Sequence, residues 1–198
     1  MTPHRLPGRL RSARGQSMVE MAMILPFMVI LVLGMIELSW ALYDQHVVTK
    51  LTREGSNLIS RNTTLQDAAT VLRSMSSRPV DFSGANSKVI FSVIKRGATT
   101  GSTNYNKDIL YQRYEYGGFS ATSTLQTRGS GSFDPGPEHQ ANNSDSDANL
   151  QLTNLPANML TTGGMMYITE IYTRHTLITP FDRFGIQVPK TLYSIAYF

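Results

Sequence analysis

The pattern of apolar and polar residues changes sharply along the chain, and its most distinctive part lies near the N-terminus. Residues 21–36 contain no charged side chain, and one carboxylate flanks each end of this run, Glu20 before it and Glu37 after it. At about 1.5 Å per helical residue the two glutamates lie about 26 Å apart, close to the roughly 30 Å hydrocarbon thickness of a bilayer. The run is apolar on every side rather than striped, which favours a membrane-spanning helix over a buried core helix.

The residues around this run support the same interpretation. We predict a transmembrane helix over residues 16–43, with Trp40 and Tyr43 at the far membrane interface, where amphipathic rings settle. Pro26 and Gly34 lie inside the run, and both residue types are commoner in membrane helices than in soluble ones.

Charge predicts the orientation of the helix. Four arginines precede the span within residues 1–15, a basic leader without acidic residues. By the positive-inside rule the N-terminus lies in the cytoplasm and the chain beyond residue 43 lies outside. The net charge of +4 is accounted for by these arginines, so the exported part is not expected to bind nucleic acid.

Beyond the span the pattern becomes amphipathic. Residues 44–61 carry apolar side chains at helical spacing, so the helix is expected to continue as a stalk. A second helix is expected after it, with a capping box formed by Thr64 and Asp67 and an end before Pro79. The apolar face of this helix comprises Leu65, Ala68, Ala69, Leu72 and Met75.

The rest of the chain contains strand-like and loop-like segments. Strands rich in β-branched, aromatic or alternating residues are predicted at 88–95, 109–116, 167–174 and 192–198. The first two are expected to pair as a hairpin. Residues 117–149 are rich in Gly, Ser, Asn and Asp, which predicts a flexible loop. Residues 62–198 are therefore expected to form an exported α+β domain, with an antiparallel sheet of about four strands against the helices.

Composition and motifs limit the possible chemistry. The 198-residue chain contains no cysteine, which excludes disulfides and thiolate catalysis. The histidines are scattered along the sequence, at His4, His46, His139 and His175. Asp145, Asp147 and Asn149 begin like a calcium loop, but Leu150 replaces its glycine and Pro156 its final glutamate. With no hydrolase, phosphate-loop or zinc-protease motif, we expect neither an enzyme nor a cofactor or metal site.

The residues around Gly15 resemble the type IV prepilin processing motif. In that motif a peptidase cuts after the glycine on the cytoplasmic side, and glutamate is the fifth residue of the mature chain. Here the mature chain would begin at Gln16 and carry Glu20 as its fifth residue. The wider pattern to about residue 58 includes Pro26, Gly34, Glu37 and Gly55. It resembles the TadE-like family of minor pilins or pseudopilins of the Tad (Flp) tight-adherence pilus, a pattern that TadF-like and TadG-like relatives share.

This resemblance implies a pilin-like protein of the bacterial inner membrane, with its C-terminal domain in the periplasm. A prepilin peptidase would remove the leader, and the helix would then pack against other pilins on the pilus-assembly platform. A buried carboxylate needs a partner, and the resemblance implies that the new amine of Gln16 on a neighbouring subunit neutralises Glu20. Met21 stands where the major Flp pilins usually have tyrosine, and the chain is longer than theirs. Both departures favour a minor subunit.

Other interpretations stay open at this point. The chain fits a pseudopilin-like component of a secretion system with the same processing. It also fits an uncleaved, membrane-anchored periplasmic binding module or an anchored hydrolase. Ser39, Trp40 and Ala41 form a passable signal-peptide cleavage site.

Overall fold

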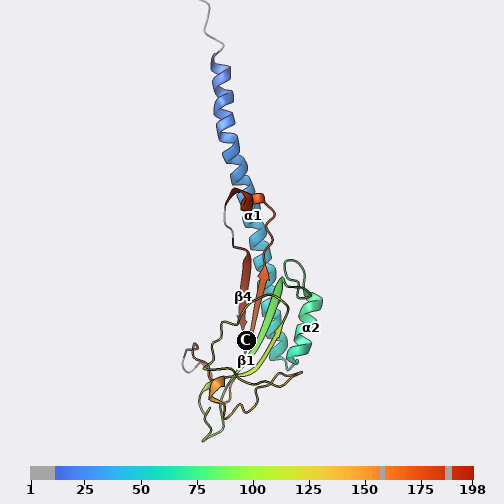
Figure 1. Cartoon of the computed structure of the whole chain (residues 1–198), viewed down its shortest axis with the longest axis vertical. Helices are drawn as coiled ribbons and strands as arrows, with labels where there is room; N and C mark the ends of the chain where they lie inside the picture. Colours follow the sequence, from blue (N-terminus) through green and yellow to red (C-terminus); the bar gives the residue numbers. More distant parts are fainter. Residues whose placement is uncertain (1–11, 157–158, 186–188) are drawn as a thin grey trace, which may run out of the picture.

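The protein consists of a folded head and one long helix that projects from it (Figure 1). The computed structural model describes residues 12–156, 159–185 and 189–198. Most of the leader predicted over residues 1–15 therefore lies outside the described residues. Helix α1 (Ser12–Ser60) runs without interruption through the apolar run and the stalk, which confirms the predicted long N-terminal helix. It ends where Asn62 adopts a left-handed backbone conformation, with φ of 61°.

Helix α2 (Leu65–Met75) follows immediately and is capped as predicted. The Thr64 hydroxyl oxygen accepts a hydrogen bond from the Asp67 backbone N–H at 3.1 Å and donates one to the Asp67 carboxylate at 2.8 Å. The predicted apolar face is buried except at Met75, whose side chain is 45% exposed. At 3.6 residues per turn, Met75 points about 80° away from Leu65, so it lies at the margin of the stripe.

The four predicted strands form one antiparallel sheet. They are β1 (Ser87–Arg96), β2 (Asp108–Tyr116), β3 (Met165–Arg174) and β4 (Thr191–Tyr197), in the spatial order β2-β1-β3-β4. Phe91 of β1 faces Tyr114 of β2 on one side and Thr169 of β3 on the other. The expected pairing of β1 with β2 is confirmed.

One face of the sheet packs on the helices. Val89, Phe91 and Val93 alternate along β1 and are buried with residues of α1 and α2, such as Val48 and Leu72. The side chains on this face of β1 pack against the apolar stripe of α1, and together they form the main core.

The opposite face is covered by the segment between β2 and β3. Leu125 from this segment is buried against Ile94, Met166 and Ile168, and Leu150 packs with Ile109. Both faces of β1 are therefore buried, which explains why its sequence is apolar without alternation. The flexibility predicted for residues 117–149 stays a prediction, but the few apolar residues of this segment are placed against the sheet.

Candidate functional site

The first half of α1 presents its apolar side chains outward. Of the described residues, this is the one helix long and apolar enough to cross a membrane, and its most apolar window buries nothing inside the protein. Leu25 is 54% exposed and Phe27 is 75% exposed. A contiguous apolar surface of this length is unfavourable in water, so this half of α1 is suited to lipid or to other apolar helices.

The predicted processing residues lie near the N-terminal end of this helix. Gly15 is exposed, and a Cβ placed on it would meet no atom within 4 Å. Gln16 donates a side-chain hydrogen bond to the exposed carboxylate of Glu20 at 3.2 Å, one helical turn further on. The structure thus brings Gln16 and Glu20 together within one chain.

Pro26 and Gly34 differ in their surroundings. Pro26 lies inside α1 without interrupting it. Gly34 lies beside the segment that follows β3, because a Cβ on Gly34 would be 3.9 Å from the ring of Phe181. Phe181 is buried and belongs to the short 3-10 helix η2 (Pro180–Phe184).

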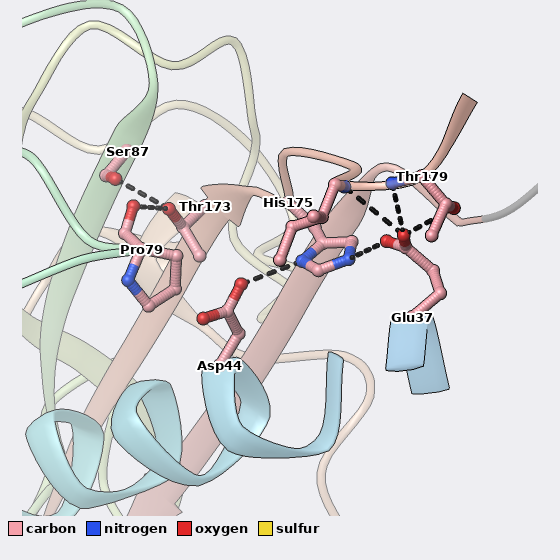
Figure 2. A network of polar contacts seen from close by, with 8 residues as sticks. Glu37, Asp44, Pro79, Ser87, Thr173, His175 and Thr179 are labelled. Atoms are coloured by element: carbon pink, nitrogen blue, oxygen red, sulfur yellow. Dashed lines mark hydrogen bonds and ion pairs between the residues drawn. The ribbon is translucent and has the colours of Figure 1, made fainter. Parts of the chain in front are cut away.

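A buried polar cluster joins the same two parts of the chain (Figure 2). The ring of His175 lies between two carboxylates of α1, with Nδ1 2.8 Å from Asp44 Oδ2 and Nε2 3.2 Å from Glu37 Oε1. The second oxygen of Glu37 accepts hydrogen bonds from Thr179, through its backbone N–H at 2.9 Å and its hydroxyl at 2.6 Å. Ile178 donates its backbone N–H to the same oxygen at 3.2 Å. We call Glu37, Asp44, His175 and Thr179 the clamp.

The clamp follows from helix geometry. Glu37 and Asp44 are seven residues apart, about two helical turns, so both carboxylates lie on the face of α1 that meets the C-terminal part of the chain. Glu37, Asp44 and His175 are each at most 3% exposed. Buried charged groups persist when they are paired and hydrogen-bonded, and both ring nitrogens of His175 lie within hydrogen-bond distance of a carboxylate.

The arrangement does not amount to a catalytic triad. A histidine base needs one ring nitrogen directed at a nucleophile, whereas both nitrogens of His175 face carboxylates. The Thr179 hydroxyl donates to Glu37 rather than to the ring. The geometry favours a structural connection between helix and sheet.

A second buried carboxylate, Glu170 on β3, holds the covering segment on the outer face of the sheet. It accepts hydrogen bonds from the backbone and hydroxyl of Thr124, at 2.9 and 2.6 Å, and from the Ser123 hydroxyl. The hydroxyl of Tyr193 on β4 donates to Glu170 at 3.1 Å. Burial, together with the charge of Glu170, raises the pKa of Tyr193 to about 12 and that of Tyr172 further.

The carboxylates of the calcium-like stretch accept hydrogen bonds from other groups of the protein. Asp145 accepts a hydrogen bond from the Thr99 hydroxyl at 2.9 Å, and Asp147 accepts one from the backbone of Asn149 at 2.9 Å. Within the part of the chain that the structure describes, no group of three or more histidine or carboxylate side chains is arranged to hold a metal ion.

Sequence reasoning found Glu37 but missed its partners. It placed Glu37 at the membrane interface and treated His175 as one of several scattered histidines. The pairing joins positions 138 residues apart, which no local pattern encodes. The available signal was the spacing of Glu37 and Asp44, two acids on one helical face beside an otherwise apolar run.

An outward-facing apolar helix that continues into the core of a small α+β head defines an anchored, pilin-like class of protein. Comparison with known families agrees, because residues 15–57 carry a TadE-like protein domain. This match includes Glu37 and Asp44 and ends before the sheet. A search of curated proteins gave no match, and neither did a search of solved structures.

Proposed function

We propose that this protein is a minor pilin or pseudopilin of a Tad (Flp) pilus, held in the bacterial inner membrane before assembly. The TadE-like domain over residues 15–57 is the observation that carries this proposal. The exposed apolar half of α1 supports it, because such a helix suits a bilayer before assembly and a bundle of pilin helices afterwards.

In this proposal a prepilin peptidase removes the leader after Gly15, on the cytoplasmic side. Glycine allows a close approach of the backbone to a protease, and Gly15 has open space around it. Glu20 is exposed, so its carboxylate could bind the N-terminal amine of a neighbouring subunit when the helices pack. The head would then lie in the periplasm or on the fibre, with a structural rather than a catalytic role in assembly and adhesion.

Mass spectrometry of the mature N-terminus, on protein from its native host, tests the processing step. We expect the chain to begin at Gln16. Replacing Gly15 with leucine should abolish this product, whereas replacing the exposed turn residue Gly84 with leucine should leave it unchanged. A chain that begins at Leu42 would indicate a signal peptide, and an intact leader would indicate an uncleaved anchor. Either result overturns the proposal.

Recovery of the protein in sheared surface fibres separates a pilus subunit from a component of a secretion system. We expect the Gln16-initiated form in the fibre fraction. Its confinement to the inner membrane in piliated cells would favour the secretion-system interpretation.

A further inference from the structure

The segment after β3 lies beside the part of α1 that leaves the apolar run. We consider residues 176–185, which follow the clamp histidine and include η2. Figure 1 shows this segment beyond the end of the sheet, alongside α1 and toward the projecting half of the helix. Its position relative to a membrane is therefore fixed by its position on α1.

The depth of this segment follows from helix geometry. Glu20 and Glu37 flank the uncharged run about 26 Å apart, close to the roughly 30 Å thickness of the hydrocarbon core, so Glu37 lies close to one boundary of that core. The backbone N–H groups of Ile178 and Thr179 bind Glu37, which places them at the same level. Phe181 lies beside Gly34, about one turn further into the apolar run.

The outer surface of the segment is suited to the lipid interface. The side chain of Ile178 is 54% exposed although it is aliphatic. Trp40, 39% exposed on α1, lines the same hollow of about 320 Å³ as Ile178. Two arginines and two carboxylates line it as well, namely Arg78, Arg174, Asp44 and Asp81. An aliphatic side chain, an indole ring and guanidinium groups together match the headgroup layer, where acyl chains and phosphates meet.

We propose that residues 176–185 form a second membrane contact, which rests in the headgroup layer on the side of the folded head. The inference depends on the membrane insertion of α1 in the proposed function. The clamp holds the segment at this depth, and Ile178 reaches into the acyl boundary beside Trp40. The head then contacts the bilayer at two places.

Site-directed spin labelling of the full chain in phosphatidylcholine and phosphatidylglycerol vesicles tests this inference. The absence of native cysteine makes single labels unambiguous. We would label Ile178→Cys, with Leu25→Cys as the mid-span reference and the exposed α2 site Ser74→Cys as the water reference. Collision rates with oxygen, which partitions into lipid, and with a water-soluble nickel complex report the depth of each label.

We expect the oxygen-to-nickel ratio at position 178 to lie between the Leu25 and Ser74 values. A value equal to that of Ser74, with Leu25 in lipid, would overturn the membrane contact but leave the anchor intact. A water-like value at Leu25 would overturn the membrane anchoring itself.

A third outcome concerns a protein partner. Low collision rates with both reagents at position 178, with spin–spin broadening that disappears on dilution with unlabelled protein, would show that a second copy covers the segment. That result would also overturn the lipid contact.

Discussion

At the scale of single residues, the structure depends on carboxylates that lie away from solvent and are surrounded by donors. Glu37 and Asp44 both bind His175. Glu170 accepts hydrogen bonds from Thr124, Ser123 and Tyr193. Each connects segments that are distant in sequence. Removing one partner of such a carboxylate leaves a desolvated charge. The loss of stability is therefore larger than the loss from breaking a typical surface hydrogen bond.

Replacing His175 with alanine should lower the free energy of unfolding by about 3–5 kcal/mol, because two buried carboxylates lose their common partner. The measurement is denaturant unfolding of the detergent-solubilised chain, followed by near-ultraviolet circular dichroism. His46 is exposed on the same helix that carries the carboxylates, so His46→Ala is the matched control and should change stability by less than about 0.5 kcal/mol. Equal effects of the two substitutions would argue against the clamp.

Alkaline pH should destabilise the fold through Tyr193. An unfolded tyrosine ionises near pH 10.0, whereas the folded pKa is about 12, so between these values the unfolded chain holds fewer protons. Stability is therefore fully present below about pH 10 and falls as pH rises toward 12.

Tyr193→Phe should reduce this loss between pH 9 and 11 when unfolding is measured at a series of pH values. The exposed Tyr105, replaced by phenylalanine in the same way, serves as the control and should leave the slope unchanged. An unchanged slope in Tyr193→Phe would contradict the assignment.

At the scale of elements, α1 changes character along its length. Its first half is apolar all round and exposed, whereas its second half buries a stripe that includes Val48, Leu51 and Ile59. Gly55 lies in this second half, where the helix approaches the sheet closely. A Cβ there would lie 2.8 Å from the Cγ2 atom of Thr169 and 3.1 Å from Leu72. Close packing, rather than helix propensity, therefore explains this glycine.

Replacing Gly55 with leucine should destabilise the head by about 1–3 kcal/mol or more, because the added side chain forces α1 away from β3. Arg53→Leu introduces the same side chain at an exposed position of the same helix and should be nearly neutral. Thermal unfolding of both variants in detergent provides the comparison. A more stable Gly55→Leu protein would show that the interface has room to adjust.

Local periodicity predicted most elements, because burial of a helix or strand face imposes a spacing on its apolar residues. The two helices, the Thr64 cap and the four strands follow from such patterns. Contacts between elements that are distant in sequence do not follow from such patterns. The contact of His175 with Glu37 and the covering of the outer sheet face by residues 117–156 depend on how the elements meet. Met75 shows the same limit within one helix, because the apolar stripe predicts its burial and the structure leaves its side chain 45% exposed.

At the scale of the whole molecule, the boundary between anchor and head differs from the one that hydropathy suggests. Trp40 and Tyr43 mark a membrane interface by composition, but Glu37 already belongs to the head through the clamp, and Gly34 already lies beside Phe181. The folded unit therefore begins about two turns before residue 43.

This boundary predicts how the head tolerates truncation. A chain that begins at Leu31 retains Glu37, whereas one that begins at Leu38 leaves His175 with Asp44 alone. We expect the longer form to be more stable by about 1–3 kcal/mol in denaturant unfolding, because the shorter form leaves the donors of Ile178 and Thr179 without their acceptor. Glu37→Gln in the longer form should reproduce part of the loss and separates the carboxylate from the added helical turn. Equal stabilities would place the boundary after Glu37.

The clamp also determines how the molecule carries mechanical load. His175 follows directly on β3, an inner strand of the sheet, and its backbone N–H also donates to the carbonyl of Lys190 just before β4, at 2.8 Å. A tensile force along α1 therefore reaches two adjacent strands through Glu37 before it reaches the stalk core. A subunit pulled lengthwise out of a bilayer would distribute the stress over several hydrogen bonds, and its head would move as one body with the helix.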